Sequence, residues 1–497
     1  FNIRAGNTLV GFASHEETKR AIEGKTVGKA FQDQMIFDDR LERIEQKAQE
    51  IERAFEQFHE LQTKLDLDPA GMAASKRQLQ QMLGILRAEL DGYLASEYGI
   101  DRNSISKREG YDARFAQWQQ SHQPFHWWVE FYGIMIRGGF DVIIGNPPYV
   151  EYSKVREEYS IQQYSTESCG NLFAYVFERS LTLLKKNALL GLIIPHSLAA
   201  TYRMAPLQKV LIDKTIGAYS YFSRRPGKLF DGADQCLCIF IGSFKKAETL
   251  YEAENISTTY QRWYTEERAN LFGKINYFPL QLSRSWKQFH ALPKLGEAIE
   301  HKILGKISKQ KPLSSFMVDS GKEFYCHRIA RYFIKSTNFI PYFCSERDGV
   351  KRSDDFKVYY VTDALTSIFA VAVLNSSLFY WFWRVMFDGY HCGKDNIGAF
   401  PFEPTSVSAE LAQEFENLVT KLMDSFIANS ARKTVRYKGS GIVEYDEFNV
   451  KYSKPIIDEI DRVLARHYGF TNEELDFIIN YDIKYRMGRD SANEEEE

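Results

Sequence analysis

The chain contains the stretch Gly139-Phe140-Asp141-Val142-Ile143-Ile144-Gly145-Asn146-Pro147-Pro148-Tyr149-Val150. Its first half is short, apolar and rich in β-branched side chains, which is typical of a strand buried on both faces of a parallel sheet. Its second half predicts a stiff loop, because two consecutive prolines restrict the backbone after Asn146. Ligands of open α/β sheets bind just beyond the carboxyl ends of the strands. The stretch therefore predicts a strand that ends in a functional loop.

Strand and helix patterns alternate after this loop. Residues 171–186 have helical periodicity, residues 188–194 are predicted as a buried strand, and residues 204–214 as a helix. Two further strands are predicted at 216–222 and 235–241. Alternation with short connections is typical of a doubly wound α/β sheet.

The rest of the chain differs in pattern, and the length suggests about three domains. Apolar residues at three- and four-residue spacing before the loop predict a helical hairpin that turns near Asp68-Pro69-Ala70-Gly71. The predicted organisation is a strand of the sheet domain at 1–13, a mainly helical insertion at 14–124, the sheet domain with its loop at 125–248, a mixed α+β domain at 249–405, a C-terminal helical region at 406–490 and a disordered acidic tail at 491–497.

Composition limits the possible functions. Of 497 residues, 44% are apolar and 26% charged, which is the balance of a globular protein. Lys and Arg number 63 against 66 Asp and Glu, so the formal charge is −3, and any affinity for nucleic acid must come from local patches. The six cysteines include no Cys-x-x-Cys pair, so neither a disulfide scaffold nor a metal site is predicted.

The chain shows no targeting signal. Its N-terminus lacks the pattern of a signal peptide. The most apolar stretch, residues 368–387, is interrupted by Asn375-Ser376-Ser377 and carries Arg384, which predicts buried structure and no membrane span. We therefore expect a cytoplasmic protein. Because the chain opens on Phe1 and not on Met, we also expect it to be the C-terminal portion of a longer protein.

The residues of the loop suit one chemical task. The exocyclic amine of a nucleobase is a poor nucleophile, because its lone pair is delocalised into the ring. The Asn146 side-chain oxygen and the Pro147 carbonyl can each accept one amine hydrogen, which favours tetrahedral nitrogen, and the stiff loop preorganises both acceptors. Tyr149 can stack on a base flipped out of a duplex. The alternative is an ordinary tight turn after a strand.

These residues resemble the gamma-class adenine-N6 DNA methyltransferases, most closely the large methylases of restriction-modification and phage-defence systems. The stretch 139–150 is similar to their catalytic motif, and three other segments also match: Asn2-Ile3-Arg4-Ala5-Gly6-Asn7-Thr8-Leu9, Asn171-Leu172-Phe173-Ala174 and Gly191-Leu192-Ile193-Ile194-Pro195-His196-Ser197. The resemblance implies a class I, Rossmann-like methyltransferase sheet with a target-recognition domain. It also implies S-adenosylmethionine as cofactor, double-stranded DNA as partner and possible restriction or defence subunits.

The resemblance assigns roles by position. Asn146, Pro147, Pro148 and Tyr149 hold and activate the target adenine, whose amine attacks the cofactor methyl directly. Asn7 and Asn146 contact the cofactor, and Phe230 joins Tyr149 in stacking on the base. A purely structural role stays open for two of these residues. Asn7 can be a simple turn cap, and Phe230 an ordinary core aromatic.

One part of the family pattern is absent from the sequence. The glycine-rich cofactor loop and the acidic residue that grips the cofactor ribose have no match. The resemblance thus implies a truncated catalytic domain that binds the cofactor poorly on its own. A DNA-specificity or binding module of a larger enzyme, inactive in isolation, is the alternative. Methylation of a protein glutamine amide uses a similar motif, but the large aromatic C-terminal domain disfavours it.

Sequence recognition is predicted in the domain at 249–405. Arginine suits bidentate contacts with guanine, and lysine suits contacts with phosphates. Cations that alternate with aromatic residues supply the candidate DNA contacts, although surface cations are common in all proteins. The candidates are Arg328, Arg331, Lys335, Arg347, Lys351 and Arg352.

Overall fold

The computed structural model describes residues 3–23, 31–63, 69–101, 108–230, 232, 234–245, 255–280, 291–437 and 441–488. The chain divides into two compact units. The first unit comprises Phe1–Leu198, Arg203–Ala218 and Ile239–Ala253. The second comprises Ala199–Tyr202, Tyr219–Cys238 and Glu254–Glu497.

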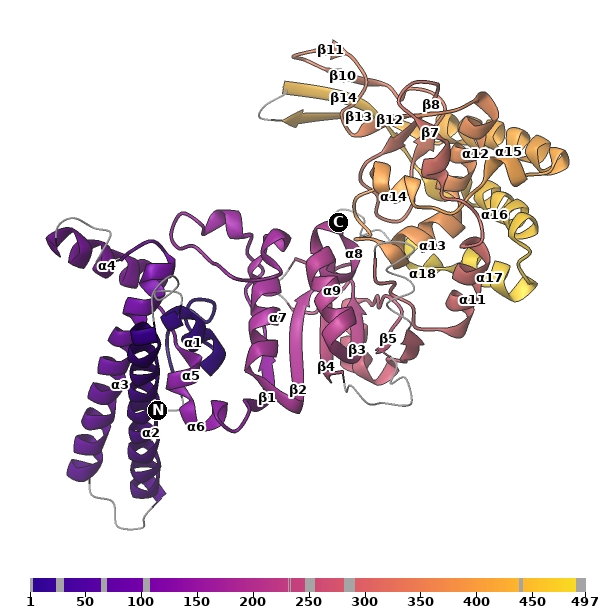
Figure 1. Cartoon of the computed structure of the whole chain (residues 1–497). Helices are drawn as coiled ribbons and strands as arrows, with labels where there is room; N and C mark the ends of the chain where they lie inside the picture. Colours follow the sequence, from indigo (N-terminus) through magenta and orange to yellow (C-terminus); the bar gives the residue numbers. More distant parts are fainter. Residues whose placement is uncertain are drawn as a thin grey trace. The chain divides into compact units, whose positions relative to one another are not determined.

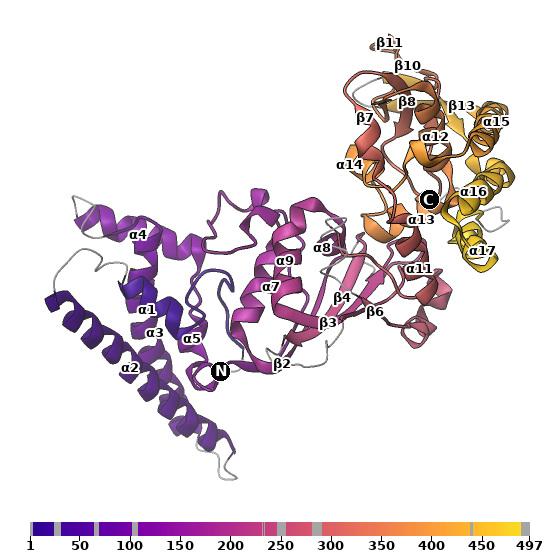
Figure 2. The same ribbon diagram turned by 45° about the vertical axis from the view of Figure 1, so that its right-hand side comes forward.

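The first unit begins with helices, as predicted for residues 14–124. The two longest, α2 and α3, lie side by side (Figures 1 and 2), where Arg43 and Lys47 on α2 each bond to Glu89 on α3. Pro69 begins α3, a position where its missing N–H leaves no helical bond unmade. The predicted hairpin is confirmed, while Asp68 lies outside the described residues. The helices are α1 His15–Glu23, α2 Phe31–Thr63, α3 Pro69–Glu97, α4 Arg108–His122, α5 Trp127–Glu130 and α6 Tyr132–Met135.

A six-stranded sheet follows in the order β1-β2-β4-β3-β5-β6. β1 and β2 pair in parallel, with Ile144 opposite Gly191, whereas β5 and β6 pair antiparallel. The fold is therefore α/β with a mixed sheet. The strands are β1 Phe140–Gly145, β2 Leu184–Pro195, β3 Thr215–Phe222, β4 Leu237–Phe244, β5 Asn255–Ser257 and β6 Phe278–Leu280, and the helices between them are α7 Leu172–Leu183, α8 Ser197–Ala200 and α9 Ala205–Lys214.

Helices cover one face of the first strands and leave the other face open. α7 and α9 lie on the same side of the sheet (Figure 2), and Phe177 of α7 packs on Phe240 of β4 with ring centroids 5.3 Å apart. On the opposite face the strands carry exposed apolar side chains: Val142 is 62% exposed, Ile144 84%, Leu189 52% and Ile241 51%. The prediction that residues 140–144 are buried on both faces was wrong. The doubly wound arrangement stays a prediction, since the described residues place helices on one face of these strands.

The predicted strand at residues 1–12 is also absent from the described part of this segment, residues 3–12. These residues form a turn, with one isolated bridge between Asn7 and Pro124. A strand needs a continuous ladder of backbone bonds with a neighbour. Within the described residues this segment makes only scattered ones: the Asn7 N–H donates to the Gln123 carbonyl, and the Val10 and Phe12 carbonyls accept from the Phe125 and Trp128 N–H groups. Residues 1 and 2 lie outside the described part.

The second unit contains two separate four-stranded sheets, in the orders β7-β12-β8-β9 and β11-β10-β14-β13. The first consists of β7 Met317–Val318, β8 Lys322–His327, β9 Ser336–Thr337 and β12 Phe356–Val361. The second consists of β10 Phe343–Ser345, β11 Gly349–Val350, β13 Ser430–Tyr437 and β14 Gly441–Phe448. The helices of this unit are α11 Ala298–Ile307, α12 Ala364–Asn375, α13 Ser377–Met386, α14 Lys394–Gly398, α15 Ala409–Ala428, α16 Lys454–Tyr468, α17 Asn472–Asn480 and α18 Ile483–Arg486.

The apolar stretch at 368–387 forms the centre of this unit. It folds into α12 and α13, which meet at an angle of 69°, and Trp381 and Trp383 are completely buried. Asp461 accepts the Ser377 and Leu378 N–H groups at the start of α13, and burial raises the pKa of its carboxyl to about 6. Within the described ranges, no single helix is long and apolar enough to span a membrane, although this bent pair meets that test jointly.

The C-terminal region differs in part from its predicted helical character. α15 and α16 confirm the helices expected there, but β13 and β14 form an antiparallel hairpin between them. The hairpin was detectable, since alternating side chains flank the glycine-rich stretch Lys438-Gly439-Ser440-Gly441. The predicted acidic tail at 491–497 lies outside the described residues.

Leu189 and Leu190 test the difference between the two faces of the sheet. They are neighbours on β2, yet Leu190 is completely buried and Leu189 is 52% exposed. We expect Leu190→Ala to lower the free energy of unfolding by about 2–5 kcal/mol through loss of core packing. Leu189→Ala should change it by about 0.5 kcal/mol, as for surface sites. Urea unfolding followed by circular dichroism measures both, and equal losses would mean that the second face is covered in solution.

Candidate active site

The loop Asn146-Pro147-Pro148-Tyr149 leaves the carboxyl end of β1, as predicted. The Tyr149 hydroxyl lies 2.5 Å from Asn146 Oδ1 and 2.9 Å from the Ile193 carbonyl near the end of β2. The Asn146 side chain is exposed and Pro147 is buried. Tyrosine thus ties the asparagine amide to the neighbouring strand, which fixes where that amide points.

Burial raises the pKa of Tyr149 to about 12. The phenol therefore stays protonated at neutral pH and acts as a hydrogen-bond donor. A carboxamide oxygen has two lone pairs. Asn146 Oδ1 can therefore accept the hydrogen bond from the Tyr149 hydroxyl and a second hydrogen bond from a ligand. The exposed side of the loop thus keeps an acceptor available for a ligand amine.

A second predicted motif, Asn171-Leu172-Phe173-Ala174, lies beside this loop. Asn171 caps α7 by accepting the Phe173 N–H, and the Leu172 N–H donates to the Val150 carbonyl at 2.9 Å. Asn171 Nδ2 and Arg203 both bond to Glu151, at 3.1 and 2.7 Å. Burial alone would raise the pKa of Glu151, but these hydrogen bonds lower it. The loop is therefore held at both ends, by β2 and by the start of α7.

Asn7 takes the geometry of a turn cap. Its Oδ1 accepts the Leu9 N–H at 3.1 Å, and its own N–H donates to the Gln123 carbonyl at 2.8 Å. This matches the simpler of its two predicted roles. Its contact with a cofactor stays a prediction, for which the side-chain amino group is the remaining polar atom.

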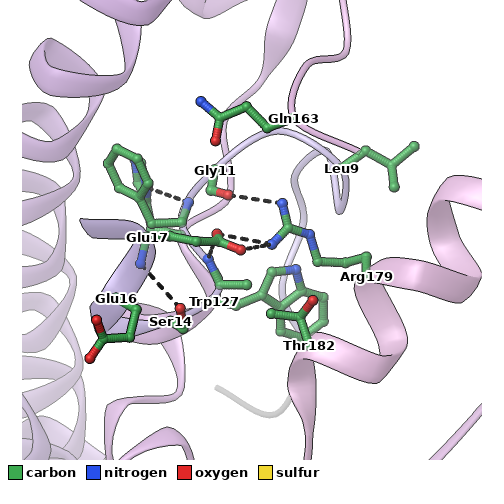
Figure 3. Close-up of polar contacts among 12 residues, drawn as sticks. Leu9, Gly11, Ser14, Glu16, Glu17, Trp127, Gln163, Arg179 and Thr182 are labelled. Carbon is green, nitrogen blue, oxygen red and sulfur yellow. Dashed lines mark hydrogen bonds and ion pairs between the residues drawn. The ribbon is translucent and has the colours of Figure 1, made fainter. Parts of the chain in front are cut away.

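Arg179, which sequence reasoning missed, anchors the segment that follows Asn7 (Figure 3). Its Nη1 lies 3.1 Å from both carboxylate oxygens of Glu17, its Nη2 lies 3.3 Å from the Gly11 carbonyl, and its Nε donates to Tyr164 Oη at 2.8 Å. Tyr164 in turn donates to the Leu9 carbonyl at 3.0 Å. The signal lay in helical spacing, because Arg179 follows Tyr175 by four residues and so falls on the buried side of α7.

The edge of the sheet beside the loop is open. β1 is the first strand in the sheet order, so within the described ranges it pairs only with β2. Val142 and Ile144 are exposed next to this edge. A parallel strand with apolar side chains on both faces is normally covered on both faces, and the backbone groups on the free side of β1 could pair with a further strand.

Phe230 lies half-buried in the loop before β4, within the second unit. Asn146 and Tyr149 belong to the first unit. The stacking role of Phe230 therefore stays a prediction.

The predicted DNA contacts fall into two groups within the second unit. Arg328 and Lys335 line one cavity between its two sheets. Arg347, Lys351 and Arg352 lie on or directly after the β10–β11 hairpin, where Asp348 pairs with Arg347 at 3.3 Å and with Lys351 at 2.7 Å. Arg331 is exposed and does not line that cavity.

Sequence reasoning missed the cations of β13, because a helical region was expected there. Arg432 bonds to Asp446 at 2.7 Å, and Lys433 lies 3.5 Å from Glu447. Arg436 is exposed on the same strand. Arg432, Thr434 and Arg436 fall on one face of the strand, while Val435 and Tyr437 fall on the other, which is the period-two signal of a strand.

Known proteins that match the chain are restriction-modification enzymes. Residues 63–226, which include β1, the loop, α7 and β2, match the model of the family described as Eco57I restriction-modification methylase. A segment of 130 residues is 35% identical to a Methanocaldococcus jannaschii protein, itself provisionally described as a type II restriction enzyme and methyltransferase. That segment is 26% of this chain and 11% of the relative, so the chain spans a small part of it. Both matches are with proteins described as methylases or methyltransferases of restriction-modification systems.

Two solved structures of restriction enzymes are similar to part of the chain. The Type IIL restriction-modification enzyme MmeI, in complex with DNA, has a TM-score of 0.34 and 11% identity, over 68% of this chain and 56% of that chain. The type IIG restriction endonuclease BpuSI has a TM-score of 0.26 and 8% identity, over 68% of this chain and 54% of that chain. Both likenesses are partial, and the chain spans about half of each enzyme.

Arg179 provides a test of how the segment at 9–13 is held. Its side chain is 8% exposed, so Arg179→Met leaves Glu17 and Tyr164 without their partner, and we expect a loss of about 3 kcal/mol in the free energy of unfolding. The control is Arg203→Met, which breaks an ion pair of the same unit that is 51% and 39% exposed, and should lose about 0–1 kcal/mol. Urea denaturation measures both, and a loss as small as that of the control would contradict the anchoring role.

Proposed function

We propose that this chain is the catalytic-loop and DNA-recognition part of a DNA methyltransferase that modifies the N6 amine of adenine in a restriction-modification or phage-defence system. The observation that carries the proposal is the Asn146–Tyr149 loop, which is held by two strand ends and presents an exposed carboxamide oxygen. The family match over this segment supports methyl transfer as the reaction class. Adenine as target rests on the resemblance of the loop.

The loop residues act on the amine of a base flipped from double-stranded DNA. Asn146 Oδ1 accepts one amine hydrogen while it keeps the bond from Tyr149. The Pro147 carbonyl accepts the other, and the two contacts draw the lone pair out of the ring. Because the acceptors are fixed before the base arrives, little reorganisation is needed. The partly exposed ring of Tyr149 offers a stacking surface for the base.

S-adenosylmethionine, when bound, supplies an electrophilic methyl group on a sulfonium. The residues of this chain fit only part of that cofactor. Asn7 offers one amide group, but no glycine-rich turn or acidic strand-end residue matches the remainder. The open edge of β1 lies next to Asn146, and we assign the missing cofactor contacts to a further element that pairs there. The same observation favours the second candidate, a DNA-specificity module that is inactive in isolation.

Replacement of Asn146 tests the assignment. In a protein that carries this chain together with the cofactor-binding element, Asn146→Ala should lower methylation of DNA by about 100-fold or more, because it removes one preorganised acceptor. Tyr149→Phe, which keeps the ring and loses the hydroxyl, should lower it by about tenfold. Incorporation of labelled methyl groups into DNA measures the rate. DNA affinity should be unchanged in both variants, and full activity of Asn146→Ala would refute the proposal.

Calorimetry with S-adenosylmethionine tests the division of the site. For the 497-residue chain by itself we expect no binding tighter than about 1 mM, an affinity near −4 kcal/mol. In the same preparation, duplex DNA should bind with an affinity that falls steeply as salt rises. A micromolar dissociation constant for the cofactor would mean that this chain builds the pocket differently. DNA binding that ignores salt would count against the recognition role.

A further inference from the structure

A cavity of about 520 Å³ lies within the second unit, between its two four-stranded sheets. It is lined from one side by β10, β13 and β14 and from the other by β8, β12 and their connecting segments. A volume of this size is typical of a site for a small ligand. Nothing in the catalytic loop's chemistry uses this cavity.

The pairing of strands places three aromatic side chains along one wall of the cavity. Phe343 of β10 stands opposite Tyr445 of β14, so their side chains share one face of the sheet. Tyr437 of β13 lies on the same face, because it is four residues beyond Lys433, which is paired with Tyr445. All three aromatic residues line the cavity, and Tyr437 at its mouth is 52% exposed.

The opposite wall presents a second pair of rings. His327 of β8 stands opposite Phe356 of β12, with ring centroids 5.0 Å apart and an angle of 84° between the planes. The partly buried Lys335 also lines the cavity. Its Nζ makes no hydrogen bond or ion pair with any residue that the structure describes, and burial lowers its pKa. Glu447 attracts this ammonium without a hydrogen bond, so its donors stay unused, which favours a ligand atom that accepts from them.

The acidic side chains of the cavity are mostly engaged elsewhere. Asp355 bonds to Arg328 at 2.6 Å, Asp446 to Arg432 at 2.7 Å, and Glu447 lies 3.5 Å from Lys433. These pairs leave Lys335 as the cation that can serve a ligand. The site therefore combines aromatic walls with one hydrogen-bond donor of positive charge.

Planar heterocycles with acceptor atoms match this combination. Aromatic residues on a sheet surface stack on nucleic-acid bases, while neighbouring cations serve phosphate or ring acceptors. The cavity is too small for a duplex but large enough for one nucleotide. We infer that it binds a single unstacked nucleotide, with the base between the two aromatic walls and an acceptor oxygen or nitrogen facing Lys335. This inference rests on the proposed DNA function and adds to it a second base-binding site, distinct from the catalytic loop.

The ligand chemistry is shared by an unpaired base of DNA and a free nucleotide. The experiment compares binding of the full chain to a perfect duplex and to the same duplex with one abasic site, whose orphan base leaves the stack easily. Fluorescence anisotropy without cofactor measures both affinities. We expect the abasic duplex to bind about tenfold tighter, the effect of stacking one base.

Variants assign that preference to the cavity. Tyr445→Ala should reduce it to about twofold or less, while binding of the perfect duplex changes little. Lys335→Met should reduce it equally, and because Lys335 is also a predicted DNA contact, the readout for this variant is the ratio of the two affinities and not the affinity for the perfect duplex. Tyr452→Ala is the matched control, because Tyr452 is 60% exposed and does not line the cavity. Circular dichroism checks that each variant is folded. If Tyr445→Ala does not fold, Lys335→Met still tests the cavity.

The outcomes separate this inference from the proposed function. A preference that is absent from the parent chain, or that survives both cavity substitutions, overturns the cavity site. A preference lost in Tyr149→Ala but kept in Tyr445→Ala assigns the orphan base to the catalytic loop and also overturns it. Free deoxynucleoside monophosphates are then added as competitors of the abasic duplex. If they compete with the parent chain but not with Lys335→Met, the natural ligand of the cavity is a free nucleotide. If they do not compete, the ligand is the unpaired base of DNA. None of these results alters the test of Asn146 by methylation.

Discussion

Parallel pairing between β1 and β2 is the constraint on which the candidate active site depends. It brings the carboxyl ends of both strands to one edge, so that the Tyr149 hydroxyl can reach Asn146 on its own loop and the Ile193 carbonyl on the next strand. Leu172 then ties the start of α7 to Val150. If the two strands ran in opposite directions, Tyr149 could not reach the end of β2. The two prolines would then stiffen the loop, but nothing would orient the Asn146 side chain.

The sequence predicted local structure well where the signal was local. The strand at 140–144, the loop after it and the helix predicted at 171–186 needed only periodicity and turn chemistry, and α7 begins one residue after the predicted start. Exposure of Val142 and Ile144 was not predictable, because apolar side chains on both faces of a strand indicate what should cover it and not what does. Residues 3–12 failed for the same reason, since a strand exists only with its neighbour. Arg179 was overlooked because a single cation in an apolar helix has meaning only beside Glu17 and Tyr164.

Ion pairing holds many of the exposed cations of the second unit. The cations that could contact phosphates are mostly held by carboxylates, such as Arg328 by Asp355, Lys351 by Asp348 and Arg432 by Asp446. This agrees with a formal charge of −3 over the whole chain. A DNA phosphate would have to replace a carboxylate at each such site, so contact would give up one ion pair for another. Such exchange contributes more to orientation than to affinity.

The open edge of β1 has a consequence for motion. A strand bonded on one side leaves alternate amide groups facing solvent, and these groups exchange their hydrogens freely while those that face β2 are protected. Asn146 is the first residue after this strand, so its restraint comes from the bonds that Tyr149 and Leu172 make around the loop and not from the free side of β1. A segment that pairs with β1 would therefore do more than add ligands for a cofactor. It would protect the exposed amides of the strand and hold the start of the loop from a second side.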